Sequence, residues 1–351
     1  MSRRAIVLAE GLLGTLVGKT ANILIMYNYR KFEVVAVIDS THSGRDAGEV
    51  LGLGYLGIPV VSTIEEALKL KPEVLIVGVA TVGGVLPERC RRIIKKAIKH
   101  GLEVWSGLHY FLSEDPEFSK LAQEVGIRIV DVRKPSKEKL RVWNGDVLKT
   151  HCGRVLVAGS DCAVGKNVTV LEITAQFEKK GYRPGIVATG QTMILVGANA
   201  GAVIDALPSD FCPGVVESLI VGLDKEGYNP VVVEGQASIL HPAYGQVSLG
   251  ILYGCMPEAV VLAHDPWRKE RAEMKIPMEP IKREIRVIEF LVNTAKVVAI
   301  AVMGYGREAS EVSEMCEYLE EELCLPAADP RRDPGKIADA VIDRLKEIDK
   351  I

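Results

Sequence analysis

The stretch "GSDCAVGKN", residues 159–167, decides how the second half of this chain folds. It follows the apolar run "RVLVAGS" (154–160), which is typical of a buried strand, and it precedes a helical pattern over 166–180. Glycines let a backbone turn so that its N–H groups converge on an anion, and a lysine at the helix start reaches the phosphates. The stretch therefore predicts a phosphate-binding loop made of Gly159, Ser160, Asp161, Cys162, Ala163, Val164, Gly165, Lys166 and Asn167.

Two features distinguish this loop from the common P-loop. Five residues separate Gly159 from Gly165, one more than usual, and this longer form resembles the loop of dethiobiotin synthetase and its relatives. Asn167 stands where a Ser or Thr hydroxyl would bind Mg²⁺, and an amide oxygen is a weaker ligand. Cys162 lies near a helix N-terminus and a lysine, which lowers a thiol pKa, so it is also a candidate acyl carrier.

The alternation of strands and helices continues to the end of the chain and predicts a parallel sheet covered by helices. The predicted strands are 154–160, 185–189, 230–235, 258–264 and 296–302, and the later predicted helices include 308–324 and 335–348. In such sheets, ligands bind beyond the carboxyl ends of the strands. Glu234 ends one strand in "VVVEGQASILHP" (231–242), and "ATGQT" (188–192) ends another.

These strand ends supply most of the remaining candidate site residues. The candidates for the chemistry are Glu234, His241 and Gln191; the candidates for Mg²⁺ are Glu234 and Asp161; the candidates for substrate contacts are Thr189, Gly190, Thr192, Asp205, Asp210, Gln236 and Ser238. A base with a pKa near 7 suits deprotonation of an amine, which favours His241 or Glu234. Backbone N–H groups of a loop such as 234–238 would stabilise an oxyanion.

The first half of the chain predicts a second α/β domain of the Rossmann type. Its strands are 5–10, 32–39, 72–80, 101–107 and 126–132, and a helix with Leu86, Cys90, Ile93, Ile94 and Ala97 on one face follows the third. The turn after the first strand contains the candidate cofactor residues Gly11, Gly14, Gly18, Lys19 and Thr20, and Asp39 ends the second strand. The glycines lack a tight GxG, so NAD, CoA and no ligand all remain open here.

The polar, irregular segment 133–152 predicts the link between a Rossmann-like domain, residues 1–148, and a P-loop domain, residues 149–351. Seven scattered cysteines without a CxxC pair suit a reducing compartment, and no apolar run reaches the ~20 residues of a membrane span. A net charge of −3 does not favour nucleic-acid binding. We expect a cytoplasmic homo-oligomer that acts on a small molecule and binds neither nucleic acid nor membrane.

The ordered segments "GLLGTLVGKTA", "SGLHYFL", "DVRKP", "GSDCAVGKN", "ATGQT", "IDALPSDF", "EGQASILHP" and "LPAADPRR" resemble, over nearly the full length, a bacterial and archaeal family that includes D-glutamate N-acetyltransferases. The resemblance implies a Rossmann-like domain followed by a dethiobiotin-synthetase-like P-loop domain, transfer of acetyl from acetyl-CoA to D-glutamate, and a dehydrogenase that acts on the product. Asn167 and Ala237 depart from the family pattern, which more often has Met-Thr-Thr after the lysine and a second glycine after EGQ.

The sequence is also compatible with three other functions. An ATP- and Mg²⁺-dependent ligase or kinase follows from the dethiobiotin synthetase likeness. A non-catalytic nucleotide-binding subunit would bind without turnover. An NAD-dependent oxidoreductase rests on Asp39 alone. If the chain is a transferase, Lys166 and its loop would bind the phosphates of CoA rather than those of ATP.

Overall fold

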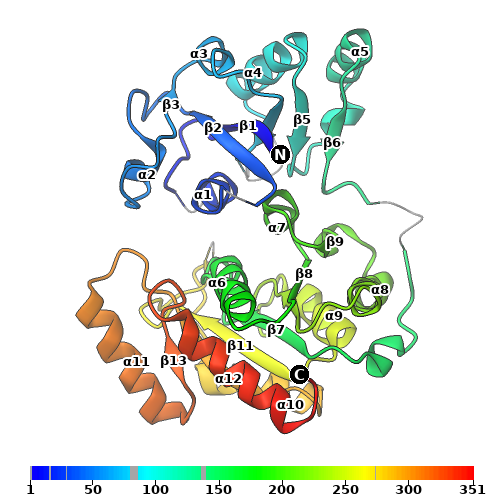
Figure 1. Cartoon of the computed structure of the whole chain (residues 1–351), viewed down its shortest axis with the longest axis vertical. Coiled ribbons are helices and arrows are strands. Elements are labelled where there is room, and N and C mark those ends of the chain that lie inside the picture. The colour runs from blue at the N-terminus through cyan, green and yellow to red at the C-terminus, as the bar shows by residue number, and fades with distance from the viewer. Residues whose placement is uncertain (1, 16, 29, 80–85, 136–139, 273) are drawn as a thin grey trace. The chain divides into compact units, whose positions relative to one another are not determined.

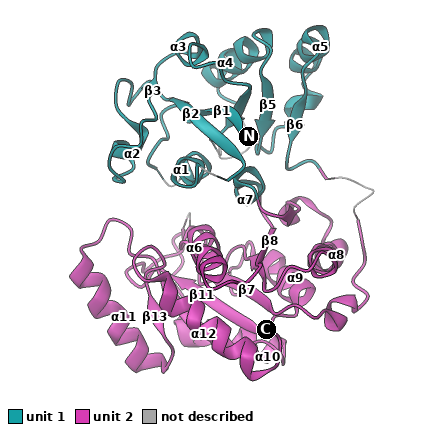
Figure 2. Ribbon diagram, viewed as in Figure 1, with its two compact units in different colours: residues 1–134, 191–197 teal, residues 135–190, 198–351 magenta. Residues whose placement is uncertain are grey.

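The structure is a computed structural model of the chain and describes residues 2–15, 17–28, 30–79, 86–135, 140–272 and 274–351 (Figure 1). The chain divides into two compact units (Figure 2). Unit 1 comprises residues 1–134 and 191–197, and unit 2 comprises residues 135–190 and 198–351. Each unit contains one all-parallel sheet, which confirms the expected pair of α/β domains.

Unit 1 is a six-stranded sheet in the order β3-β2-β1-β4-β5-β6, which is the order of a Rossmann fold. Its strands are β1 (Arg3–Leu8), β2 (Phe32–Ile38), β3 (Val60–Val61), β4 (Val74–Val77), β5 (Glu103–Ser106) and β6 (Ile129–Asp131). Its helices are α1 (Lys19–Met26), α2 (Ala47–Val50), α3 (Ile64–Leu68), α4 (Glu88–Lys99), η2 (Leu112–Glu114), α5 (Pro116–Val125) and α7 (Gln191–Val196).

Unit 2 is a seven-stranded sheet in the order β13-β12-β11-β7-β10-β8-β9. Its strands are β7 (Arg154–Gly159), β8 (Gly185–Ala188), β9 (Ala200–Gly201), β10 (Val231–Glu234), β11 (Ala259–His264), β12 (Val297–Val302) and β13 (Ala327–Ala328). Its helices are η4 (Asp146–Lys149), α6 (Lys166–Lys179), η5 (Ile204–Ala206), η6 (Ser209–Phe211), α8 (Cys212–Lys225), α9 (Gly245–Cys255), α10 (Ile281–Leu291), α11 (Ala309–Leu323) and α12 (Pro334–Glu347).

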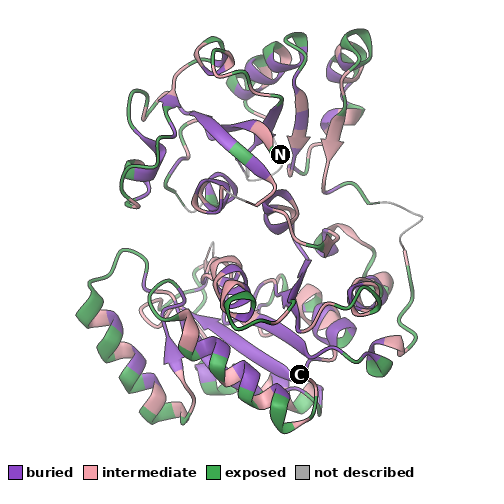
Figure 3. Cartoon of the chain, viewed as in Figure 1, coloured by how far each residue is buried: buried purple, intermediate pink, exposed green. Residues whose placement is uncertain are grey.

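Apolar β-branched residues dominate the strands because both faces of each sheet are covered by helices. The central strands are buried along most of their length, and the helices expose their outer faces (Figure 3). On α4, Cys90, Ile93, Ile94 and Ala97 form the buried face that the sequence predicts. None of the helices in the described part of the chain has the length and hydropathy of a membrane span.

Helix α7 belongs to unit 1 although the strands on both sides of it belong to unit 2. Its first residue, Gln191, accepts a hydrogen bond from Arg133 Nη1 at 3.0 Å. The hydroxyl of Thr192 bonds that of Thr20 at 2.8 Å. The chain therefore leaves unit 2 after Gly190 and returns to it at Ala198.

The compact units separate between Lys134 and Pro135, earlier than the expected boundary at 148/149. In the described part of the predicted link, Val147 and Cys152 are buried in the core of unit 2. Glu217 on α8 accepts hydrogen bonds from the N–H groups of Asn144 and Val147. These contacts attach the second part of the link to unit 2. Residues 136–139 of the link, and Ala80 at the end of a predicted strand, lie outside the described residues.

Candidate functional site

The loop at 159–167 joins β7 to α6, as the sequence predicts. Ala163 and Gly165 have positive φ angles of 50° and 91°, which turn the backbone sharply before the helix begins. A Cβ atom on Gly159 would lie 2.8 Å from Lys166 Nζ, so the lysine packs directly over a glycine. Lys166 is buried, and its Nζ donates to the carbonyl oxygen of Asp161 at 2.7 Å.

Arg268, which follows β11, holds the outer side of this loop. Its Nη1 donates to the carbonyl oxygen of Cys162 at 2.6 Å, and its Nη2 donates to that of Ala163 at 3.1 Å. In a trans peptide the carbonyl and the next N–H point in opposite directions. The N–H groups of Ala163 and Val164 therefore face away from Arg268, which is the orientation that an anion-binding loop requires.

Asp161 is fully buried and joins the loop to the segment after β11. Its Oδ2 accepts hydrogen bonds from Arg268 Nη1 at 3.0 Å and from the N–H of Ala272 at 2.7 Å. Its Oδ1 lies 3.8 Å from Arg271 Nη1 and 3.7 Å from His241 Nε2. Two arginines and an imidazole thus surround this carboxylate.

Ser160, beside the first glycine, pairs with the last residue of β11. Its Oγ lies 2.8 Å from His264 Nδ1. Burial lowers the pKa of His264 to about 4, so the imidazole is neutral at pH 7. The base of the loop therefore rests on an uncharged Ser–His hydrogen bond.

Glu234 ends β10 and holds the turn that follows β8. Its Oε2 accepts hydrogen bonds from the N–H groups of Thr189 at 2.9 Å and Gly190 at 3.0 Å. The Thr189 hydroxyl donates to the carbonyl oxygen of Glu234 at 2.8 Å and accepts from Gln236 Nε2 at 2.9 Å. The structure thus brings together four of the predicted residues, Glu234, Thr189, Gly190 and Gln236.

His241 holds the turn that precedes α9 with one ring nitrogen. Its Nδ1 accepts from the N–H groups of Ala243 and Tyr244, both at 3.2 Å, and its ring stacks on that of Tyr244. A neutral imidazole that accepts at Nδ1 carries its proton on Nε2. The nitrogen that faces Asp161 is therefore a donor, so this geometry supports a hydrogen-bonding role for His241 better than that of a general base.

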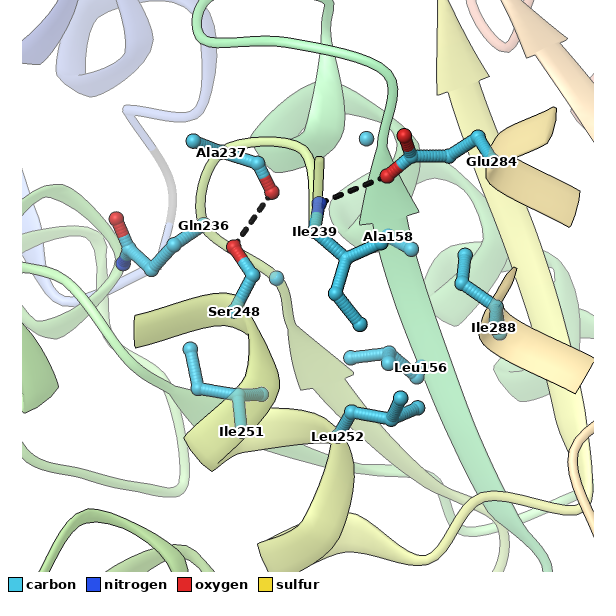
Figure 4. A pocket seen from close by; sticks show the side chains of 12 residues that line it. Leu156, Ala158, Gln236, Ala237, Ile239, Ser248, Ile251, Leu252, Glu284 and Ile288 are labelled. Carbon is cyan, nitrogen blue, oxygen red and sulfur yellow. Dashed lines mark hydrogen bonds between the residues drawn. The ribbon is translucent and has the colours of Figure 1, made fainter. Parts of the chain in front are cut away.

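A small pocket lies at the carboxyl ends of β7 and β10, beside α9 and α10 (Figure 4). It has a volume of about 300 Å³, including space open to solvent, and its walls are mostly aliphatic, with Gln236, Ser248 and Glu284 as polar members. Glu284 accepts from the hydroxyl of Ser238 and from the N–H of Ile239, both at 2.8 Å. Burial raises the pKa of the Glu284 carboxyl, against the effect of these two bonds.

Two matching family models cover most of this chain. The P-loop domain of DUF1611, a domain of unknown function, matches residues 141–338, and its N-terminal Rossmann-like domain matches residues 40–135. The chain belongs to the DUF1611 family. This membership confirms the resemblance noted from the sequence motifs.

Similar proteins agree with this assignment. The D-glutamate N-acetyltransferase of Tritonibacter scottomollicae is 30% identical over 285 residues, which are 80% of this chain and 84% of that protein. The D-glutamate N-acetyltransferase of a Pseudoalteromonas species is 33% identical over 279 residues, 77% of this chain and 81% of that protein. The crystal structure of a DUF1611 family protein from Anabaena variabilis is 31% identical, with a TM-score of 0.90 over 97% of this chain and 100% of that chain.

The glycine turn of the N-terminal domain differs from the P-loop in how it uses its N–H groups. Leu13 N–H donates to Asp39 Oδ2 at 3.1 Å, Gly14 N–H to Asn22 Oδ1 at 3.0 Å, and Gly18 N–H to Thr15 Oγ1 at 3.2 Å. Asp39 thus closes the turn on itself. Three described N–H groups of this turn therefore bond to side chains, and the cofactor contacts of the turn stay a prediction.

Other predicted residues lie apart from the hydrogen bonds that join Glu234, Thr189 and Gln236. Asp205 and Asp210 are exposed in η5 and η6, and Lys19 is exposed at the start of α1. The side chains of Gln191 and Thr192 bond to residues of unit 1.

The sequence reasoning missed Arg268, Arg271, His264 and Glu284. All four lie outside recognisable motifs. One signal was available for His264, because it ends a predicted strand next to the P-loop strand.

Proposed function

We propose that this chain is an N-acetyltransferase that moves acetyl from acetyl-CoA to the amine of D-glutamate or a similar amino acid. The similarity to two proteins named D-glutamate N-acetyltransferase, over about four fifths of the chain, carries the proposal. The loop at 159–167 supports it because Lys166 and the N–H groups directed away from Arg268 suit the phosphates of CoA. The cytoplasmic location, the dehydrogenase partner and the homo-oligomer remain predictions.

Of the two candidate bases, Glu234 fits the geometry better than His241. The amine of the acceptor must lose a proton during attack on the thioester carbonyl. His241 directs an N–H at Asp161, whereas Glu234 has a carboxylate, one oxygen of which two backbone N–H groups fix in place. We therefore assign the base to Glu234, and to His241 a supporting role beside Asp161 at the phosphate loop.

The direct test is an acetyl-transfer assay on the purified chain. Acetyl-CoA is incubated with D-glutamate, and free CoA thiol and N-acetylglutamate are measured, with L-glutamate and D-aspartate as comparison acceptors. We expect Glu234→Gln to lower kcat by about 10²-fold or more with little change in KM. A folded wild-type chain that acetylates none of these acceptors would overturn the proposal, and a fully active Glu234→Gln would remove Glu234 from the chemistry.

Calorimetric titration separates the transferase from the ligase alternative. The chain is titrated with acetyl-CoA and, separately, with Mg-ATP. We expect binding of acetyl-CoA, and Lys166→Met should weaken it by about tenfold or more, since a charge-assisted contact to phosphate is lost. Binding of Mg-ATP alone, with ADP release in the presence of an acceptor, would favour a ligase or kinase.

A further inference from the structure

The likeness to dethiobiotin synthetase implies a magnesium ion beside the phosphates, and the residues of this loop do not fit one. A P-loop magnesium is held by a hydroxyl at the start of the helix, by carboxylates and by the phosphates themselves. The sequence offers three positions for these ligands, Asn167, Asp161 and Glu234.

The hydroxyl ligand has no substitute in the first turn of α6. Asn167 occupies its position, and an amide oxygen is the weaker ligand. The next hydroxyl along the helix, that of Thr169, is buried and donates to the carbonyl oxygen of Gly165 at 3.0 Å. This hydroxyl is therefore committed to the helix backbone.

Asp161 is placed to bind cationic side chains. Arg268 and a backbone N–H occupy Oδ2, and Oδ1 faces Arg271 Nη1 at 3.8 Å and the protonated Nε2 of His241 at 3.7 Å. Oδ1 accepts no hydrogen bond from the described residues. A dication at this oxygen would lie next to the guanidinium of Arg271 and would be repelled by it.

Asp161, Cys162 and His241 bring one potential metal-ligand atom each to within 4.8 Å of one another. A metal on this group would require the lone pair of His241 Nε2. Because Nδ1 already accepts two backbone N–H groups, the proton of a neutral ring is on Nε2. A histidine that binds metal usually does the reverse and donates from its second nitrogen. In this tautomer His241 Nε2 turns an N–H, and no lone pair, towards Asp161 Oδ1, which lies 3.7 Å away and beyond hydrogen-bond distance.

Glu234 directs its carboxylate away from the loop. In the sheet, β10 lies between β7, which leads into the loop, and β8. The two hydrogen bonds to Oε2 come from Thr189 and Gly190, which follow β8. The carboxylate is thus fixed on the side of β10 opposite the phosphate loop.

Positive side chains occupy the neighbourhood in which a magnesium ion would act. Lys166 lies over Gly159, and Arg271, only 3% exposed, lies between the loop and the segment after β10. Arg271 Nη1 is 3.5 Å from the carbonyl oxygen of Ser160, and Nη2 is 3.2 Å from that of Leu240. These contacts are longer than the about 2.9 Å of a strong N–H···O bond, so a phosphate oxygen would be a better acceptor.

We propose that the loop binds its phosphate ligand without a divalent cation, and that Lys166 and Arg271 neutralise the phosphate charge. This inference rests on the proposed function, because it concerns the ligand of the same site. The ligand class is a phosphate ester that carries no chelated metal ion, such as the diphosphate of CoA. A magnesium–nucleoside triphosphate complex is the class that the site disfavours. Arg268 is a positioning residue that shapes the loop from outside.

The experiment is calorimetric titration of the full chain with CoA and with ADP, each in EDTA and in excess Mg²⁺. We expect the CoA dissociation constant to change by less than about threefold between the two buffers. Arg271→Met should weaken CoA binding by about tenfold or more in both buffers, and Arg271→Lys should restore part of the affinity. The matched control is Arg283→Met, which removes an exposed arginine from α10. Circular dichroism verifies that each variant is folded.

The outcomes separate this inference from the proposed function. If CoA binds only in Mg²⁺ while acetyl transfer proceeds, the metal-free site is wrong and the transferase stands. If ADP binds in EDTA and CoA binds in neither buffer, the metal-free site stands and acetyl-CoA is wrong as the donor. If neither ligand binds in either buffer, the inference is overturned, and the transfer assay decides the function by itself. Unchanged CoA affinity in Arg271→Met would overturn the role of Arg271.

Discussion

Protonation of His264 should destabilise unit 2 in mild acid. The imidazole is buried at the end of β11 and bonds Ser160 at the base of the phosphate loop. Burial lowers the pKa of His264 from 6.5 to about 4, because the desolvated site disfavours the charged ring. In the unfolded chain the same ring titrates at its ordinary pKa. Below that value the ring is protonated in the unfolded state but stays neutral in the folded state. The free energy of unfolding therefore falls as pH falls from 6.5 to about 4.

The expected loss follows from the two pKa values. Between about pH 7 and about pH 4.5, the difference between the folded and unfolded pKa values lowers the free energy of unfolding by about 2 kcal/mol. The assay is urea denaturation of the wild type and of His264→Asn across this range, since an asparagine amide can replace Nδ1 opposite Ser160 and does not titrate. The wild type should lose about 2 kcal/mol more than the variant. The control is His151→Asn, at an exposed histidine. Equal losses in the wild type and His264→Asn would refute the assignment of a neutral, buried ring.

Three further changes test the structure that supports the site. Arg154→Met should lower the unfolding free energy by about 3 kcal/mol in urea denaturation, because the buried carboxylate of Glu258 loses the guanidinium at 2.7 Å and keeps only Lys350 Nζ, at 3.5 Å, as its cation. Glu217→Ala should cost about 1 to 3 kcal/mol and speed proteolysis within residues 140–150, since two linker N–H groups lose their acceptor. Gly235→Ala adds only one methyl group but should impair acetyl transfer, because the new Cβ would lie 2.4 Å from the carbonyl oxygen of Val157 and displace the backbone after β10. A fully active variant would contradict this packing.

Most of the fold was predictable from local sequence because the long buried strands carry a strong apolar signal. The predicted strand at 258–264 and helix at 308–324 agree with β11 and α11 to within one residue at each end. The strands that the sequence did not reveal are β3, β9 and β13, each of two residues. A segment of that length has no periodicity, and it forms a strand only because a neighbouring strand offers its hydrogen bonds.

The missing parts of the site are those that depend on tertiary structure. Arg268 and Arg271 are more than a hundred residues from the loop they contact, in a segment without glycine or repeated spacing. They reach it because β11 pairs directly with β7, an order that no local pattern encodes. The assignment of helix α7 to unit 1 has the same origin, since its partners Thr20 and Arg133 lie 172 and 58 residues earlier in the chain.

The two glycine turns show most clearly where sequence pattern stops being informative. Both follow the first strand of a parallel sheet, and both contain glycines and end in a glycine–lysine pair at a helix start. In the first turn the side chains of Asp39 and Asn22 accept the backbone N–H groups, so the turn is closed. In the second, Arg268 instead binds the carbonyl groups and turns the following N–H groups the other way. The side of the peptides that surrounding side chains occupy therefore determines which backbone groups such a turn can offer to a ligand. Acceptors beside the first turn take up the N–H groups of Leu13 and Gly14, whereas the donor beside the second turn leaves the N–H groups of Ala163 and Val164 directed away from it.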